Sequence, residues 1–236
     1  MTTFESGGKH ISVELFMPTV SGLHPAVVVA YGTEGMGKGI TPDHDVGAAI
    51  RGYAEHLASA GFVALIPHFF ERTGTPEGFQ TVMPVYALHH DEWLDTLGDC
   101  LKFAVSRPEV DKKIKPGLLG FSLGGHLALR RAKIKTGVAV GAVVEFYAPI
   151  SKSPFNGLGD HLGDLPPIQI HHGGKSDHIV ESTQSDELER LLVAAGKVKG
   201  VGYERHDYLD EGHGFRGVAA IKASKQRTAD FFKKHL

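Results

Sequence analysis

The sequence predicts a three-layer α/β fold, in which helices cover both faces of a mostly parallel sheet. Short apolar runs alternate along the chain with longer segments that repeat apolar residues at helical spacing, as strands joined by helices do. The run at 26–30 is apolar throughout, which is typical of a parallel strand covered on both faces. With 236 residues, 42% of them hydrophobic, one domain over 1–236 can bury a substantial core.

The first half of the chain alternates strand and helix patterns. Strands are expected at 10–17, 26–30 and 62–67, and helices at 46–60 and 88–106. Gly61 and Pro108 end the two helices. Residues 31–39 are too rich in Gly for a regular element, and 68–86 are expected to be irregular.

The second half continues this alternation. Strands are expected within 115–121, 138–148, 168–172 and 201–208, and helices from Ser122, over 183–196 and over 218–232. Thr183 and Asp186 match a capping box at the start of one helix. Residues 151–166 form a loop rich in Gly and Pro.

A glycine-flanked serine follows the short apolar strand that begins near Lys115. Gly120-Phe121-Ser122-Leu123-Gly124 matches the G-x-S-x-G elbow, a strained strand-to-helix turn that projects the serine oxygen clear of the backbone. Side chains two residues before or after the serine would collide in this turn, so glycine fits there. The helix that follows points unpaired N–H groups at the serine, where they can stabilise an oxyanion.

Two other strand ends carry the partners that a nucleophilic serine needs. Asp177 follows the strand at 168–172 and His213 follows the strand at 201–208, and sites in such sheets form at the carboxyl ends of strands. An imidazole can accept the serine proton near neutral pH, and a carboxylate fixes its tautomer. Ser122, Asp177 and His213 follow the chain order of the α/β-hydrolases.

Other residues compete for these roles. Glu145, Asp164 and Asp210 are alternative acids, and Glu145 needs a partner because it interrupts an apolar strand. A metal site is another option, with candidate ligands in His171, His172, Asp177 and His178, or in His89, His90 and Asp91. Adjacent strand residues point to opposite faces, and neither an H-E-x-x-H motif nor a cysteine cluster occurs. No metal and no other cofactor is therefore expected.

Composition argues against several classes of partner. The net charge is −2 with Lys and Arg spread along the chain, which argues against nucleic acid. No apolar stretch approaches membrane-spanning length, and the N-terminus lacks a basic region followed by an apolar run. Cys100 is the single cysteine, so no internal disulfide is expected. We expect a cytoplasmic monomer or dimer that acts on a small molecule.

The motifs together resemble the dienelactone hydrolase family over roughly residues 9–235. The resemblance rests on the serine elbow, His172-Gly173 with Asp177, Gly212-His213-Gly214-Phe215, Glu34-Gly35-Met36-Gly37 and Arg72. It implies that the Leu123 and Gly35 N–H groups form an oxyanion hole. It also implies that Arg72 binds a substrate carboxylate and that Glu34 lies beside the nucleophile. The best-known members use cysteine as the nucleophile, whereas Ser122 needs a general base.

The sequence thus predicts an α/β-hydrolase fold that cleaves small carboxylic esters or lactones, including anionic ones, through an acyl-Ser122 intermediate. Residues 149–166 are too few for a helical lid, so no large lid domain is expected. Candidate walls of the open site are Met36, Tyr86, Tyr147 and Phe155. The alternatives are an amide or peptide hydrolase, a ligand-binding protein of this fold with little turnover, and a metal-dependent hydrolase.

Overall fold

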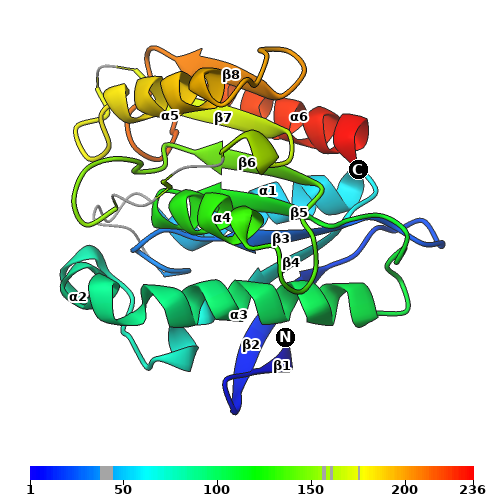
Figure 1. Ribbon diagram of the computed structural model, residues 1–236. Coiled ribbons are helices and arrows are strands. Elements are labelled where there is room, and N and C mark those ends of the chain that lie inside the picture. The colour runs from blue at the N-terminus through cyan, green and yellow to red at the C-terminus, as the bar shows by residue number, and fades with distance from the viewer. Residues whose placement is uncertain (38–44, 156–157, 160–161, 175) are drawn as a thin grey trace.

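One mixed sheet forms the centre of the molecule (Figure 1). The computed structural model describes the chain except residues 38–44, 156–157, 160–161 and 175. Within the described residues the strand order is β1-β2-β4-β3-β5-β6-β7-β8. The strands are β1 (Thr2–Ser6), β2 (Lys9–Phe16), β3 (Ala26–Ala30), β4 (Val63–Pro67), β5 (Gly117–Phe121), β6 (Ala142–Phe146), β7 (Ile168–Gly173) and β8 (Tyr203–Tyr208).

The sheet is parallel from β4 through β8, and β1 and β2 add two antiparallel strands at one edge. The prediction of a mostly parallel sheet is confirmed. All five residues of β3, β4, β5 and β6 are buried, because helices cover both faces of these strands.

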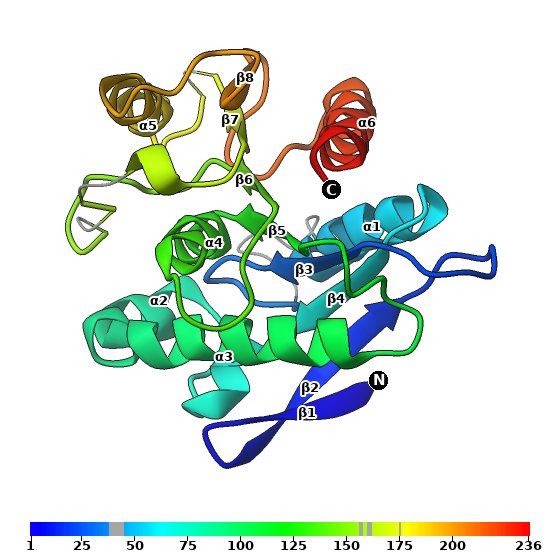
Figure 2. The ribbon, with the colours of Figure 1, turned by 45° about the vertical axis from the view of Figure 1, so that its right-hand side comes forward.

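Helices pack on the two faces of the sheet (Figure 2). One face carries α1 (Val46–Ser59) and α6 (Val218–His235), and the other carries α3 (Tyr86–Ser106), α4 (Leu123–Lys133) and α5 (Thr183–Ala194). Asp45 caps α1, since its side chain accepts the Ala48 N–H at 2.7 Å. On α3, the apolar positions that face the sheet are fully buried, including Trp93 and Cys100.

Three local features differ from the sequence-based expectations. The strand β1 was not expected, because only two of its five side chains are buried. Residues 68–86 contain short helical turns: η1 (Phe69–Arg72), α2 (Phe79–Val82) and η2 (Met83–Val85). The predicted capping box is wrong: Ser182 is the N-cap of α5 without a side-chain cap bond. Asp186 instead forms an ion pair with Arg205 at 2.7 Å.

The described residues of the connection between β6 and β7 form no large lid. They include one short helical turn, η3 (Leu162–Asp164). No helix among the described residues is both long enough and apolar enough to cross a membrane. The carboxyl ends of the parallel strands therefore stay uncovered by any inserted helical domain.

Candidate active site

Ser122 occupies a strained turn between β5 and α4. Its backbone has φ 53° and ψ −119°, a region that a non-glycine residue adopts only where its surroundings enforce it. A Cβ on Gly120 would lie 2.3 Å from the Gly124 carbonyl oxygen, and one on Gly124 would lie 2.1 Å from the Ala30 oxygen. The Ser122 N–H donates to the Phe146 carbonyl at 2.9 Å. The geometry of the predicted elbow is therefore present, with both glycines sterically required.

His213 lies between Ser122 and Asp177. Its Nε2 is 3.0 Å from Ser122 Oγ, and its Nδ1 is 3.0 Å from Asp177 Oδ2. The structure thus brings together residues that are distant in the chain: His213 is 36 positions from Asp177 and 91 positions from Ser122. The ring of His213 packs against that of Tyr147, with ring centres 4.5 Å apart.

Asp177 is buried and held by backbone donors. Its Oδ1 accepts the N–H groups of Val180 at 2.8 Å and Ile179 at 3.1 Å, which leaves Oδ2 directed at His213. Burial by itself raises the pKa of Asp177, but the hydrogen bond and charge of His213 and the Val180 N–H outweigh it. The pKa therefore lies below its usual value, and this carboxyl is ionised at neutral pH.

Among the described residues, the two expected oxyanion donors differ in their hydrogen bonding. Leu123 is the first residue of α4, so its N–H has no partner within the helix. The Gly35 N–H, the other expected donor, instead donates to the Gly32 carbonyl at 3.1 Å. Glu77 also fills the space beside Gly35, where an added Cβ would lie 2.0 Å from the Glu77 carboxyl carbon.

A cavity of about 620 Å³ opens at Ser122. Tyr147 and Phe155 line it as expected, whereas Met36 and Tyr86 are buried and do not. Glu34 also lines it, and its Oε1 accepts the Phe79 N–H at 3.1 Å.

The dienelactone hydrolase family model matches residues 11–236. The chain belongs to the dienelactone hydrolase family. A carboxymethylenebutenolidase of Rhodococcus opacus is 28% identical over 217 residues, covering 84% of this chain and 78% of the relative. A probable 2-oxo-3-(5-oxofuran-2-ylidene)propanoate lactonase of Bradyrhizobium sp. is 24% identical over 243 residues, covering 98% and 92%. The crystal structure of a dienelactone hydrolase from Anabaena variabilis superposes with a TM-score of 0.69 at 20% identity, covering 100% and 96%.

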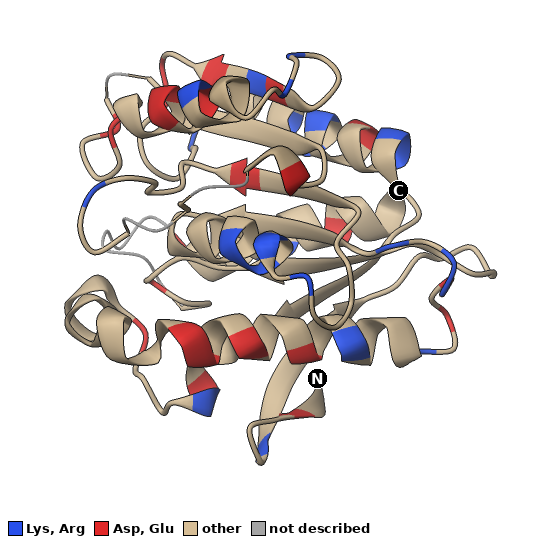
Figure 3. Cartoon of the chain, viewed as in Figure 1, with Lys and Arg blue, Asp and Glu red and all other residues tan. Residues whose placement is uncertain are grey.

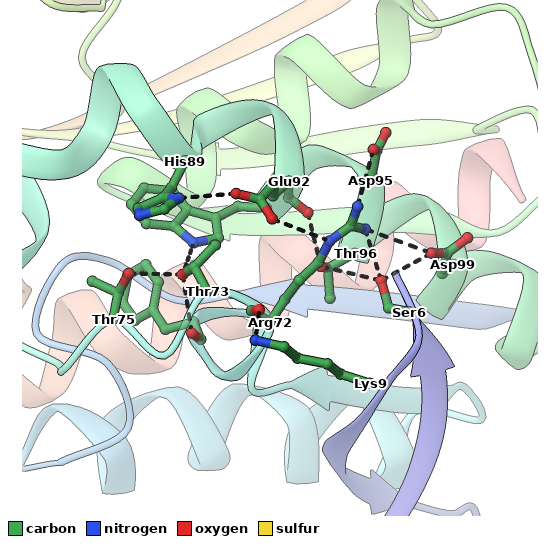
Figure 4. A network of polar contacts seen from close by, with 12 residues as sticks. Ser6, Lys9, Arg72, Thr73, Thr75, His89, Glu92, Asp95, Thr96 and Asp99 are labelled. Carbon is green, nitrogen blue, oxygen red and sulfur yellow. Dashed lines mark hydrogen bonds and ion pairs between the residues drawn. The ribbon is translucent and has the colours of Figure 1, made fainter.

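In this dienelactone hydrolase family member, Arg72 does not line the cavity at Ser122. Figure 4 shows its guanidinium next to Ser6, Glu92, Asp95 and Asp99. Its guanidinium lies 3.4 Å from Asp95, 3.8 Å from Asp99 and 4.0 Å from Glu92, and it donates to Ser6 Oγ at 2.9 Å. These three carboxylates belong to α3, along which acidic residues are prominent in Figure 3. These contacts do not support the expectation that Arg72 binds a substrate carboxylate, because the α3 carboxylates already pair with its charge.

Among the described residues, Asp177 is the carboxylate that pairs with His213, and the alternative acids have other surroundings. Glu145 is fully buried in β6, and its Oε2 accepts the Ala148 N–H at 2.9 Å. Burial raises the pKa of Glu145 to about 8, against the opposing effects of the Ala148 hydrogen bond and the Arg205 charge. Asp164 and Asp210 are exposed, and Asp164 pairs with Lys135 at 3.6 Å.

Two of the candidate metal ligands, His171 and His172, are held by other partners. Within the described part of the chain, no three His, Cys, Asp or Glu side chains are grouped to hold a metal ion. His171 contacts Tyr208 and Gln169 through its two ring nitrogens. His172 contacts Ser185 Oγ at 2.6 Å and the Val180 carbonyl at 2.8 Å.

Sequence reasoning missed the walls that α1 and α6 contribute. The cavity is also lined from these two helices by Val46, Ala49, Ile50, Tyr53, Ile221 and Lys225. Helical spacing predicts which residues form an apolar face, but core and cavity-lining positions share that face. One apolar wall could have been found from the sequence. Phe215 lies two residues after His213, and its side chain lines the same cavity.

Proposed function

We propose that this chain hydrolyses small carboxylic esters or lactones through an acyl-Ser122 intermediate. The observation that supports it most is the hydrogen-bonded line from Asp177 through His213 to Ser122 Oγ, with 3.0 Å at each step. The line ends at a cavity that can hold a small organic molecule.

Each side chain has a defined role in this reaction. His213 Nε2 accepts the Ser122 proton as Oγ attacks the carbonyl carbon, and it then protonates the leaving alcohol. In the second half, His213 accepts a proton from the water that attacks the acyl carbon, and it then returns a proton to Ser122 Oγ as the acid is released. Asp177 stays ionised, fixes the tautomer of His213 and stabilises the imidazolium.

The tetrahedral oxyanion needs two donors in this proposal. Leu123 N–H supplies one from the start of α4. The second comes from the turn that Gly35 closes, and its candidates are the N–H groups of Thr33 and Glu34, because both residues line the cavity. Glu34 and Tyr147 would contact the substrate from two sides.

Ser122→Ala tests the proposal with p-nitrophenyl acetate and a small lactone. We expect kcat to fall by about 10³-fold or more, because the covalent route is removed. Ser182→Ala is the matched control, since Ser182 makes no side-chain cap bond at the start of α5. A fluorophosphonate should label the wild-type chain and should not label the Ser122→Ala variant.

Undiminished turnover by Ser122→Ala would refute the proposal. A wild-type chain that neither turns over esters nor reacts with the fluorophosphonate would instead favour a ligand-binding protein. The lactone belongs in the assay because two of the relatives are named as a lactonase and a carboxymethylenebutenolidase. Anilide analogues of the same acids distinguish ester from amide hydrolysis.

A further inference from the structure

We propose that the ester which this site accepts carries an apolar chain, on one side of its ester bond, that binds between α1 and α6. This inference rests on the proposed function and specifies its substrate class. It does not depend on a substrate carboxylate bound by Arg72, since Arg72 lies among the α3 carboxylates outside the cavity.

The α1–α6 side of the cavity is apolar. Val46, Ala49 and Ile50 of α1 line it together with Ile221 of α6, and Phe215 adds an aromatic ring next to the histidine loop. Figure 2 shows these two helices side by side on the same face of the sheet. A chain placed here would exchange water for hydrocarbon over most of its length.

An aromatic path connects this region with the nucleophile. The Phe121 ring directly precedes Ser122 in the chain and lies 5.0 Å from the Tyr53 ring, centre to centre. The Tyr53 hydroxyl is bonded to Ser224 Oγ at 2.7 Å, so its polar end already has a partner. Tyr53 therefore offers its ring to a ligand and not its hydroxyl.

The charged residues Glu34, Lys152, Glu181, Arg216 and Lys225 also line the cavity, and the contacts of two of the lysines show where their charges lie. Lys152 pairs with Glu181 at 2.9 Å, and both come from loops outside α1 and α6. The Lys225 ammonium lies 5.3 Å from the centre of the Tyr53 ring, and a Cβ on Gly52 would lie only 2.6 Å from its Nζ. Its charge is thus directed to the surface of α1, while its methylene stem extends the apolar wall.

The size of the cavity points in the same direction. Its volume of about 620 Å³ falls within the range of roughly 300–1,000 Å³ that suits drug-sized ligands. An acetyl ester would leave much of this volume unfilled. Each added methylene should raise kcat/KM about fourfold until the chain reaches the end of the apolar region.

Two ester series test the inference. One varies the acid (p-nitrophenyl acetate, butyrate and hexanoate), and the other varies the alcohol (methyl, butyl and hexyl acetate, followed by pH-stat). In at least one series, kcat/KM should rise by more than about tenfold from the first member to the second. In the responsive series, Ala49→Phe should lower the preference for the longest chain at least tenfold, because its ring fills the space between α1 and α6.

Ala48→Phe is the matched control, since Ala48 is the exposed neighbour on the same helix and does not line the cavity. It should leave the chain-length preference unchanged. Flat or falling profiles in both series overturn the inference, as does an equal loss on short and long chains in Ala49→Phe. If Ser122→Ala loses acetate hydrolysis while the profiles are flat, only this inference fails. If Ser122→Ala keeps activity, the proposed function fails as well.

Discussion

Replacement of Glu145 by Gln should make the free energy of unfolding less dependent on pH. Glu145 is 0% exposed in the middle of the sheet. Its Oε2 accepts the Ala148 N–H at 2.9 Å, and its Oε1 has no hydrogen-bond partner among the described residues. Burial raises its pKa from 4.5 to about 8. The folded chain therefore keeps this carboxyl neutral at pH values where the unfolded chain ionises it.

The sign and the magnitude follow from these pKa values. Between about pH 4.5 and pH 8 the unfolded state binds fewer protons at Glu145 than the folded state does. The stability that the neutral carboxyl contributes is complete below the lower pKa and is lost as pH rises towards the higher one. The loss is about 1.4 kcal/mol per pH unit, or roughly 3 kcal/mol across two units. Gln is neutral throughout and keeps an oxygen that can accept the Ala148 N–H.

Urea unfolding of both proteins at about pH 5.5 and about pH 7.5 measures this effect. The Glu145→Gln variant should gain roughly 3 kcal/mol over the wild type between the two conditions. Asp164→Asn is the control, because Asp164 is an exposed carboxylate whose removal should produce no such divergence. If the wild type and Glu145→Gln differ equally at both pH values, the buried carboxyl does not titrate as argued.

Three further substitutions test the site and its supports. Asp177→Asn should lower kcat by about 10³–10⁴-fold with a small change in KM, because the tautomer of the histidine is lost; steady-state kinetics with intact near-UV circular dichroism would check this. Arg72→Ala should lower the free energy of unfolding by about 1–3 kcal/mol and leave the ratio of kcat/KM for anionic and neutral esters unchanged. A shift in that ratio would show that Arg72 does interact with anionic substrates. Gly124→Ala should lower the melting temperature sharply, since its Cβ would lie 2.1 Å from the Ala30 oxygen; a stable, active variant would contradict this steric argument.

The sheet and the relative placement of Ser122, His213 and Asp177 could be predicted from local patterns. Apolar strands mark the parallel sheet, and parallel strands deliver the residues after their carboxyl ends to one edge. The strand β1 escaped because its sequence, TTFES, buries only two side chains. Its conformation depends on pairing with β2, which no local pattern records.

The expected roles of Arg72 and Gly35 depend on features that the local sequence does not show. Arg72 binds carboxylates from α3 that come 20 to 27 positions later in the chain, and a sequence does not reveal which acidic side chains face it. For Gly35, the motif identifies the correct loop, but the turn uses that particular N–H internally. Which amide of a loop stays free is decided by its dihedral angles, and these are not encoded in residue spacing.

The elbow has a consequence for how the reactive atom can change. Two features hold the backbone of this turn: the hydrogen bond from Ser122 N–H to the Phe146 carbonyl, and the close backbone packing at Gly120 and Gly124. Neither feature involves the serine oxygen. A sulfur atom at the same Cβ would inherit the same position and the same strained turn. Exchange of serine for cysteine therefore alters the acidity of the attacking group while the framework stays as it is. In this fold, the position of the attacking atom is set by the backbone turn and does not depend on whether that atom is oxygen or sulfur.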